Sequence, residues 1–289
     1  MAALVELAPA KVNLTLEILG RRADGYHLLD SLVVFASIAD RLSFTPGPAL
    51  SLKVGGETAE QAGPLDDNLV LKAARALADE VPELKLGRFT LEKRLPVAAG
   101  LGGGSSDAAA ALRLLANANG IARNSGVLRK IAPRIGADVP VCVDPRSRRM
   151  RGVGEQLSAP LKMPKLAAVM VNPRVAVRTK DVFTRLGLKP GGPLRPAAPS
   201  RALPRSIEAF VEYLSRHGND LEAPAMEIQP VVAQVLAGIR KSNRCLLARM
   251  SGSGATCFGI FESPHAATAA AKRLSAVQPD WWVRATTFG

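Results

Sequence analysis

A regular alternation of apolar and polar side chains runs through residues 12–18 of the chain. The apolar positions are Val12, Leu14, Leu16 and Ile18, and the polar positions between them are Asn13, Thr15 and Glu17. A period of two is typical of a half-buried strand. Other apolar runs predict strands at residues 31–37, 41–45, 50–54, 89–95, 166–173, 245–250, 256–261 and 281–288.

Apolar residues with helical spacing separate these strands. The clearest helix begins at the capping residues 66–68, and its apolar face holds Leu69, Ala73, Ala76 and Leu77. Further helices are expected at residues 108–115, 124–134, 179–185, 206–216, 231–241 and 264–277. The final order of strand, strand, helix and strand suits a split ferredoxin-like layer. Residues 188–205 are rich in proline and basic side chains and predict a mobile surface loop.

The composition is that of a globular protein, with 289 residues of which 47% are hydrophobic and 22% charged. This length suits one large or two moderate domains. Three cysteines without paired spacing indicate reduced thiols, as in a cytoplasmic protein. The three histidines lie far apart in the sequence, so no metal cluster is expected. The first residues have neither the basic nor the apolar region of a signal peptide, and no membrane span is predicted.

The net charge of +13 and the pI near 10.2 fit two classes of protein, nucleic-acid binders and enzymes that handle polyphosphates. Much of the excess is concentrated in residues 146–151 and 189–205, which are interpreted as solvated surface. Neither run interleaves aromatic with basic side chains, as stacking on single-stranded RNA requires. We therefore expect no nucleic-acid partner.

A glycine-rich loop, Pro96-Val-Ala-Ala-Gly-Leu-Gly-Gly-Gly-Ser-Ser-Asp107, precedes an alanine-rich run. Its four glycines allow positive φ angles, and residues 105–107 stand where a helix would be capped. The first turn and the dipole of a helix favour an anion, so the loop predicts a phosphate site. It lacks the lysine of a P-loop, and a serine replaces the third glycine of a dinucleotide fingerprint. A simple turn between strand and helix is the alternative.

At this loop the sequence resembles the GHMP family of small-molecule kinases, named for galactokinase, homoserine kinase, mevalonate kinase and phosphomevalonate kinase. Their loop reads Pro-x-x-x-Gly-Leu-Gly/Ser-Ser-Ser. Further similar motifs follow the family order near residues 9–30, 93–107, 136–140, 151–155 and 249–256. The resemblance implies an α+β fold with two domains. These are a ribosomal protein S5 domain 2-like ATP-binding domain at residues 1–155 and a ferredoxin-like domain at residues 156–289.

The resemblance also implies phosphorylation of a small molecule by ATP, with Mg²⁺ sharing the charge of the phosphates. Asp138 would remove the proton of the substrate hydroxyl, and Lys11 would keep Asp138 ionised and stabilise the transferring group. Asp138 also stands at the head of the apolar residues 139–143, where a buried carboxylate is costly unless it is hydrogen-bonded or paired with a charge. Without the resemblance, Asp138 could cap a turn before a strand, and Lys11 could be a solvent-facing charge. The implied ATP-binding residues are Asn68, Lys93, Pro96, Val97, Ala98, Ala99, Gly100, Leu101, Gly102, Gly103, Gly104, Ser105 and Ser106.

Residues 20–30, Gly-Arg-Arg-Ala-Asp-Gly-Tyr-His-Leu-Leu-Asp, resemble a loop of one branch of this family. That branch phosphorylates a cytidine diphosphate-linked methylerythritol on the route to isoprenoids that does not use mevalonate. Tyr26 can stack on a pyrimidine, and His27 can hydrogen-bond to its edge. Either residue could instead belong to an ordinary surface loop, and Phe183 is either an aromatic partner around cytosine or a core residue. The implied substrate-binding residues are Asn13, Tyr26, His27, Asp138, Phe183, Ser251, Gly252 and Gly254.

Two other functions stay open from the sequence. One is another GHMP enzyme, which residues 21–27 argue against because cytidine recognition belongs to one branch. The other is a basic RNA-binding protein without catalysis, whose affinity would depend steeply on salt. The protein is expected to be a monomer or a weak homodimer. Residues 218–224 match the family's Asn-Asp-Leu-Glu segment and are expected to form a capped helix start.

Overall fold

The computed structural model describes residues 3–197 and 202–289, which form two compact units. The first unit comprises residues 3–11, Ile38–Val97 and Gly102–Pro145. The second unit comprises Val12–Ser37, Ala98–Leu101 and Arg146–Gly289. Each unit is therefore assembled from segments that are separate in sequence. The expected domain division after residue 155 is continuous in sequence, and it stays a prediction.

Two long strands, β1 (Leu4–Arg21) and β2 (His27–Pro46), pair with each other, and each contributes to both units. β1 contains the expected strand, but its residues 10–16 are buried on both faces instead of one. The polar face of β1 is buried because neighbouring groups form hydrogen bonds with its side chains. The Oγ1 atom of Thr15 accepts a hydrogen bond from the Leu32 N–H (3.0 Å). The side-chain amide of Asn13 donates to the hydroxyl of Ser31 (2.7 Å).

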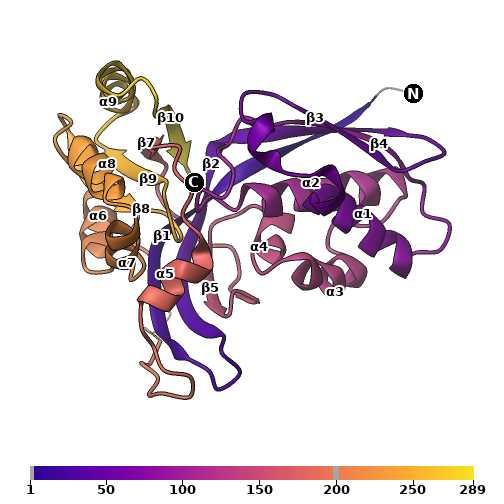
Figure 1. The fold of residues 1–289 in the computed structure, drawn as a ribbon, viewed down its shortest axis with the longest axis horizontal. Helices are drawn as coiled ribbons and strands as arrows, with labels where there is room; N and C mark the ends of the chain where they lie inside the picture. Colours follow the sequence, from indigo (N-terminus) through magenta and orange to yellow (C-terminus); the bar gives the residue numbers. More distant parts are fainter. Residues whose placement is uncertain (1–2, 198–201) are drawn as a thin grey trace. The chain divides into compact units, whose positions relative to one another are not determined.

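In the first unit, the end of β2 pairs antiparallel with β4 (Gly87–Glu92), and β3 (Ser51–Gly55) pairs parallel with β4. The 3-10 turns η1 (Ala59–Ala62) and η2 (Leu65–Asp67) precede α1 (Leu69–Glu80). The remaining helices are α2 (Gly103–Ala118), α3 (Gly126–Ile135) and α4 (Val139–Val143). Helices α1, α2 and α3 pack together (Figure 1), and the alanines at 108–111 in α2 are completely buried. Small side chains allow this close approach.

In the second unit, the start of β2 pairs with β5 (Arg148–Gly152), which also pairs with β6 (Gln156–Leu157). The main sheet has the antiparallel order β10-β7-β9-β8. Its strands are β7 (Leu166–Asn172), β8 (Cys245–Met250), β9 (Cys257–Phe261) and β10 (Trp282–Phe288). The helices are α5 (Thr179–Arg185), α6 (Ile207–Ser215), α7 (Glu222–Ile228), α8 (Val231–Arg240) and α9 (Pro264–Val277).

The order of strands and helices from β7 to β10 is that of a ferredoxin-like layer. Helix α8 packs on β8 and β9, and α9 packs on β7, β9 and β10. The two helices lie side by side in Figure 1. The α+β fold class and the ferredoxin-like layer expected from the sequence are confirmed.

Three local expectations need correction. Helix α2 begins at Gly103 with Gly102 as its N-cap, so residues 105–107 lie inside its first turns and do not cap it. The apolar stretch after Asp138 forms the short helix α4. Residues 188–195 are held against β1, where the Gly191 N–H donates to the carbonyl oxygen of Arg21 (3.0 Å). Residues 198–201 of the predicted mobile loop, like residues 1–2, lie outside the described residues.

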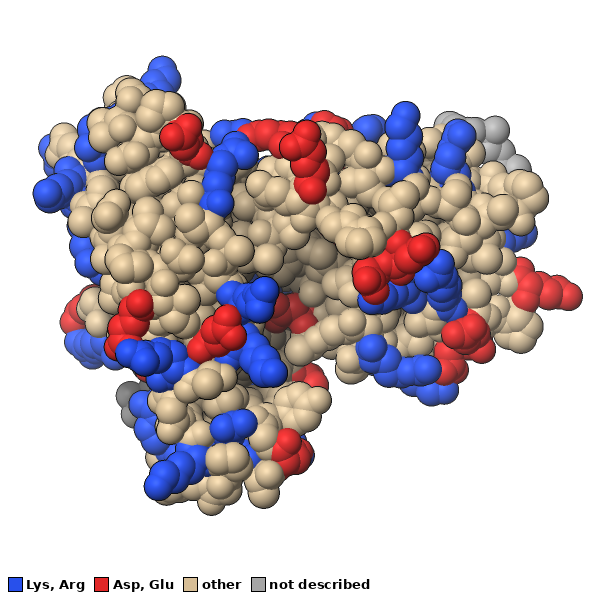
Figure 2. Space-filling model, viewed as in Figure 1, with Lys and Arg blue, Asp and Glu red and all other residues tan. Residues whose placement is uncertain are grey.

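Part of the basic excess expected at the solvated surface is buried, because Arg149, within residues 146–151, is 8% exposed and pairs with Asp30 (3.3 Å). Figure 2 shows lysine and arginine side chains interspersed with aspartate and glutamate on the visible face. Surface ion pairs account for part of this pattern, such as those of Lys130 and Arg134 with Glu80. In residues 3–197 and 202–289, no helix is both long enough and apolar enough to cross a membrane.

Candidate active site

The glycine-rich loop between β4 and α2 takes positive φ angles at Ala98, Gly100 and Gly102 (50°, 74° and 59°). Gly103 and Gly104 are instead the first residues of α2, so the expectation of positive φ at these two glycines is wrong. Without side chains, they leave the N–H groups at the start of this 16-residue helix uncovered. Those N–H groups and the helix dipole favour a bound anion.

At Gly102 the loop runs against two charged side chains. A side chain here would be strained by the positive φ, and its Cβ would lie 3.2 Å from Cε of Lys11. The same Cβ would lie 3.6 Å from Oδ2 of Asp138. Glycine at this position lets the loop backbone approach Lys11 and Asp138 closely without backbone strain or displacement of the lysine side chain.

Lys11 and Asp138 form an ion pair within the first unit, with 2.9 Å between Nζ and Oδ1. The lysine side chain is 5% exposed and the aspartate side chain 31% exposed. Asp138 occupies the N-cap position of α4, but its carboxylate makes no capping hydrogen bond. The alternatives of a solvent-facing lysine and a turn-capping aspartate are therefore wrong. A partly exposed carboxylate held by a buried ammonium is well placed to accept a proton from a bound hydroxyl.

Ser105 and Ser106 have different environments in the first turns of α2. The hydroxyl of Ser106 is buried, donates to the carbonyl oxygen of Pro9 (2.7 Å), and lies 3.3 Å from Sγ of Cys142. Burial, together with the charge of Asp138, raises the pKa of the Cys142 thiol to about 12, so this sulfur stays protonated. Ser106 therefore anchors the helix to β1. Ser105 is partly exposed.

The first half of the loop is fixed by the turn that follows β8 in the second unit. The hydroxyl of Ser251 donates to the carbonyl oxygen of Gly100 (2.9 Å) and accepts from the Asn13 N–H (3.2 Å). A Cβ at Gly252 would lie 2.9 Å from that same Gly100 oxygen. A Cβ at Gly254 would lie 2.6 Å from Sδ of Met250. These residues shape the turn and hold the loop, and their direct contact with substrate stays a prediction.

Two residues expected to bind ATP have side chains that interact with other groups of the protein. Asn68 is the N-cap of α1, and its Oδ1 accepts the Val70 N–H (2.9 Å). The Lys93 ammonium lies between the carboxylates of Asp40 and Asp107, 2.9 Å from the latter. Their roles in ATP binding stay predictions. Of the other expected loop residues, Ala98 is exposed and Val97 half-buried, while the buried ones are Pro96, Ala99 and Leu101.

An aromatic group forms at the other end of β1, within the second unit. The rings of His27 and Phe183 have centroids 4.5 Å apart, and Phe183 is only half-buried, which differs from a core residue. Tyr26 is 63% exposed. Burial, and to a lesser extent the charge of Arg21, lowers the pKa of His27, so its imidazole is neutral at pH 7. Its buried Nε2 atom makes no hydrogen bond to any described residue, which leaves it available for a polar ligand edge.

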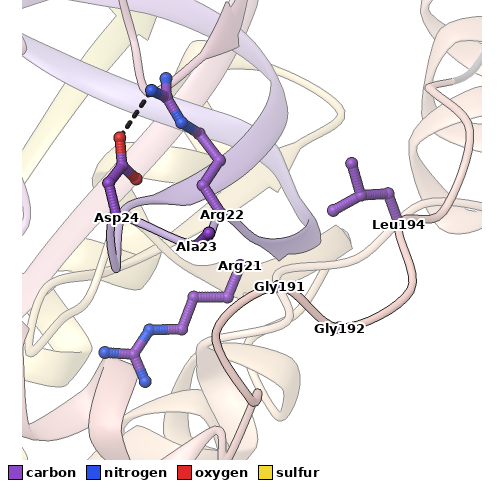
Figure 3. Close-up of a pocket in the computed structure, with 7 residues that line it drawn as sticks. All are labelled: Arg21, Arg22, Ala23, Asp24, Gly191, Gly192 and Leu194. Atoms are coloured by element: carbon purple, nitrogen blue, oxygen red, sulfur yellow. Dashed lines mark hydrogen bonds and ion pairs between the residues drawn. The ribbon is translucent and has the colours of Figure 1, made fainter.

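A cavity of about 420 Å³ lies beside the loop that carries Tyr26 (Figure 3). It is lined by Arg21, Arg22, Ala23, Asp24, Gly191, Gly192 and Leu194. Arg22 forms an ion pair with Asp24 (2.6 Å), and Arg21 donates to the carbonyl oxygens of Gly25 and Leu188. These charged groups hold the loop in shape. The cavity contains none of the expected site residues, and we assign it no part in the chemistry.

Across the described parts of the chain, no group of three His, Cys, Asp or Glu side chains could hold a metal ion with protein ligands alone. Mg²⁺ usually keeps several waters and binds through one or two protein oxygens together with substrate phosphates. The side chains of Ser105 and Asp138 supply oxygens of this kind next to the loop. This donor set fits a magnesium ion that arrives with a nucleotide.

Some residues that hold the glycine-rich loop in place were not predicted from the sequence. Asp40 and Asp107 were not singled out, although Asp40 is a carboxylate inside an apolar strand, the same signal that drew attention to Asp138. A helix starts in residues 218–224 as expected, but its N-cap is Leu221 and no side chain caps it; Oδ1 of Asn219 accepts the Leu221 N–H (3.0 Å) in the preceding turn. Its Nδ2 also donates to the carbonyl oxygens of Met250 (2.9 Å) and Gly252 (2.8 Å). Asn219 thus holds the turn that contacts the loop.

Comparison with known proteins gives two family matches. They are the GHMP kinases N terminal domain over residues 68–144 and the GHMP kinases C terminal domain over residues 196–280. A 4-diphosphocytidyl-2-C-methyl-D-erythritol kinase of Bradyrhizobium sp. (strain BTAi1) is 54% identical over 295 residues, covering 99% of this chain and 97% of its own. The kinase of that name from Rhodopseudomonas palustris (strain BisA53) is 55% identical, with coverages of 100% and 98%.

Solved structures have the same fold. A crystal structure of a 4-(cytidine 5'-diphospho)-2C-methyl-D-erythritol kinase has a TM-score of 0.79 and 36% identity, with 99% of both chains covered. A homoserine kinase from Cytophaga hutchinsonii has a TM-score of 0.68 and 16% identity, covering 100% of this chain and 95% of that one. An L. major mevalonate kinase in complex with R-mevalonate has values of 0.67 and 15%, with coverages of 98% and 95%. The last two show the fold alone.

Proposed function

The chain belongs to the GHMP kinases, in the family of 4-diphosphocytidyl-2-C-methyl-D-erythritol kinases, and we propose that it carries out the reaction for which that family is named. It transfers the γ-phosphoryl group of ATP to the 2-hydroxyl of 4-diphosphocytidyl-2-C-methyl-D-erythritol and releases ADP. The product is the 2-phosphate, an intermediate of the non-mevalonate route to isoprenoid precursors. The observation that carries this proposal is the 54–55% identity to these kinases along almost the entire chain.

The start of α2 holds the phosphates in this proposal. Phosphoryl transfer asks a protein mainly to position the groups and to neutralise charge. The uncovered N–H groups of Gly103, Gly104 and Ser105 point the positive end of the helix dipole at the β- and γ-phosphates. Mg²⁺, arriving with ATP, would share that negative charge, with Ser105 as a protein oxygen available to it. Asn68 and Lys93 complete the proposed ATP-binding set with the loop residues.

Asp138 is the proposed general base. Its carboxylate accepts the proton of the substrate 2-hydroxyl while the oxygen forms its bond to the γ-phosphorus and the bond to ADP breaks. Lys11 holds Oδ1 of this carboxylate at 2.9 Å, which fixes the orientation of Oδ2 beside Gly102. The lysine charge also offsets the negative charge that builds up during transfer. A base in this role typically contributes 10²- to 10⁴-fold to the rate.

Tyr26, His27 and Phe183 are proposed to bind the cytosine ring of the substrate. The rings of His27 and Phe183, in contact and tilted by 34°, offer an aromatic surface, and the exposed Tyr26 offers a further ring. The unsatisfied Nε2 of His27 can hydrogen-bond to the edge of the base. Binding energy from this remote end of the substrate supports specificity. Asn13, Ser251, Gly252 and Gly254 stay proposed substrate neighbours.

We further propose that the protein works in the cytoplasm as a monomer or weak homodimer and has no nucleic-acid partner. Its basic surface then serves two polyphosphate substrates. On the face visible in Figure 2, basic and acidic side chains are interspersed and form no continuous basic surface, which supports this interpretation.

The test is release of ADP from Mg-ATP by the purified protein. The acceptors are 4-diphosphocytidyl-2-C-methyl-D-erythritol, mevalonate, homoserine and none. Release with the cytidylated acceptor only, together with a phosphorylated product by mass spectrometry, supports the proposal. Release with mevalonate or homoserine instead, or with no acceptor at all, overturns it.

A further inference from the structure

A cluster of three charges is buried behind the phosphate loop, entirely within the first unit. The Nζ atom of Lys93 contacts Oδ2 of Asp40 and lies 2.9 Å from Oδ2 of Asp107. The three side chains are at most 5% exposed. Asp40 and Asp107 have no part in the proposed function, and Lys93 is one of the residues proposed to bind ATP.

The cluster joins the two ends of the loop. Oδ1 of Asp40 accepts the backbone N–H groups of Arg94 (2.5 Å) and Leu95 (2.9 Å), which immediately precede the loop. Asp107 lies in the first turns of α2, immediately after the loop. Lys93 bridges the two carboxylates, so the chain entering the loop and the helix leaving it are fastened to each other through one ammonium group.

The charge cluster also lies close to Gly103, one of the glycines proposed to bind the phosphates. A Cβ at Gly103 would lie 3.6 Å from Nζ of Lys93 and 3.9 Å from Oδ2 of Asp40. The cluster therefore lies directly beneath the first residue of α2. We propose that Asp40, Lys93 and Asp107 form a charge clamp that positions the phosphate loop for ATP, so that Lys93 contributes to ATP binding through the loop and not by direct contact with the nucleotide. This inference rests on the proposed function only in taking the loop as the ATP site.

The charges of the clamp are unequal, since two carboxylates share one ammonium. Burial, and then repulsion by Asp40, raises the pKa of Asp107 to about 7 against the opposing attraction of Lys93. The Oδ1 atom of Asp107 is buried and accepts no hydrogen bond from the residues that the structure describes, so nothing else compensates its charge. Burial alone would lower the pKa of Lys93, but the charges of Asp107 and Asp40 more than offset this and raise it. Lys93 therefore stays charged at all working pH values.

Asp107→Ala opens the clamp on the helix side with little risk to folding. Alanine is a strong helix former, and Lys93 keeps Asp40 as a partner, so no buried charge is left alone. We expect the KM for ATP to rise at least about five-fold at pH 8, with the KM for the cytidylated substrate unchanged. The matched control is Asn117→Ala, an exposed position on the same helix, which should leave both values unchanged.

Asp107→Asn keeps the hydrogen bond with Lys93 but removes the negative charge of the side chain. Asparagine keeps an oxygen that accepts from Lys93 but cannot ionise. It should match the wild type in ATP affinity at pH 6, where Asp107 itself is mostly protonated, and bind ATP two- to five-fold more weakly than the wild type at pH 8. ATP itself titrates in this pH range, and the ratio of the ATP affinities of the two proteins at each pH cancels that effect.

ATP affinity is measured by calorimetry with a non-hydrolysable analogue and Mg²⁺, alongside the kinetics and the melting temperature. Weaker binding by Asp107→Ala without a lower melting temperature supports the clamp, because a purely structural role would change both together. Unchanged ATP binding by Asp107→Ala overturns the clamp. It is also overturned if the ratio of the ATP affinities of Asp107→Asn and the wild type is the same at pH 6 and pH 8. Calorimetry needs no acceptor, so the clamp can be judged even if the protein proves not to phosphorylate the cytidylated substrate.

Discussion

The hydroxyl of Ser251 donates a 2.9 Å hydrogen bond to the carbonyl oxygen of Gly100, 151 residues earlier in the chain. The same hydroxyl accepts the Asn13 N–H, so Ser251→Ala removes both of these hydrogen bonds. We expect the free energy of unfolding to fall by about 1–3 kcal/mol and the KM for ATP to rise several-fold, because the loop loses this support. Denaturant unfolding and steady-state kinetics measure the two effects.

A second serine in the same turn provides the control. The hydroxyl of Ser253 bonds to that of Thr179 on α5 (2.9 Å) and makes no contact with the loop. Ser253→Ala should lower stability without changing the KM for ATP. Equal rises in KM for the two variants would mean that the turn acts only through general stability.

The proposed base is tested by Asp138→Asn. This variant keeps the shape of the side chain and an acceptor for Lys11 but loses the capacity to take a proton. Turnover should fall at least about 10²-fold, with little change in either KM. Asp79→Asn, an exposed carboxylate on α1, is the control and should be fully active. Near-normal turnover of Asp138→Asn would remove this residue as the base.

Local signals in the sequence allowed much of the fold, and Asp138 as a candidate residue, to be predicted. Alternation located β1, and the charge of Asp138 stood out against the apolar residues after it. Its pairing with Lys11 was expected only through the family resemblance, which also implied Phe183 as the partner of Tyr26; the ring that contacts Phe183 is that of His27.

Contacts made across the chain were not predictable in this way. The polar face of β1 is buried because β2 supplies hydrogen bonds, which no pattern within β1 reveals. Asp40 is a charged residue among apolar ones, but its partners Lys93 and Asp107 lie 53 and 67 positions further along the chain, so the sequence around Asp40 does not reveal them. The start of α2 was misplaced because Gly102 takes the left-handed N-cap role that serine normally fills.

Gly102→Ala tests the approach of the loop to the catalytic pair. The new Cβ would meet Lys11 at 3.2 Å and would be strained by a φ of 59°. Gly120 has a similar φ of 67° but open space around it, so Gly120→Ala carries the strain alone. Both variants should lose about 1 kcal/mol of stability, and only Gly102→Ala should lose most of its turnover. If both variants kept equal turnover, the close packing at Gly102 would have no part in catalysis.

The proposed cytosine group is tested by His27→Ala. Removing the imidazole takes away both the ring that packs on Phe183 and the unsatisfied Nε2. The KM for the cytidylated substrate should rise at least about ten-fold while the KM for ATP stays the same, since the lost contacts belong to one substrate. Tyr26→Ala should act in the same direction. His265→Ala, at an exposed position on α9, should change neither KM. Equal losses for ATP and the acceptor would refute the assignment.

The buried Asp107 makes stability depend on pH in a direction opposite to that of most carboxylates. Its pKa is about 7 in the folded protein and 3.8 as the ordinary value, so folding favours the protonated form. The stability due to that proton is complete below about pH 4 and is lost as the pH rises through 7. Asp107→Asn has no such proton and keeps its stability over this range. The difference in the free energy of unfolding between this variant and the wild type should therefore shift in favour of the variant by on the order of 2–4 kcal/mol between pH 4 and pH 8. Urea unfolding at a series of pH values measures this difference, and parallel curves for the two proteins would contradict it. A variant that is more stable at pH 8 yet binds ATP more weakly there would show that the Asp107 charge is retained for position, at a cost to folding.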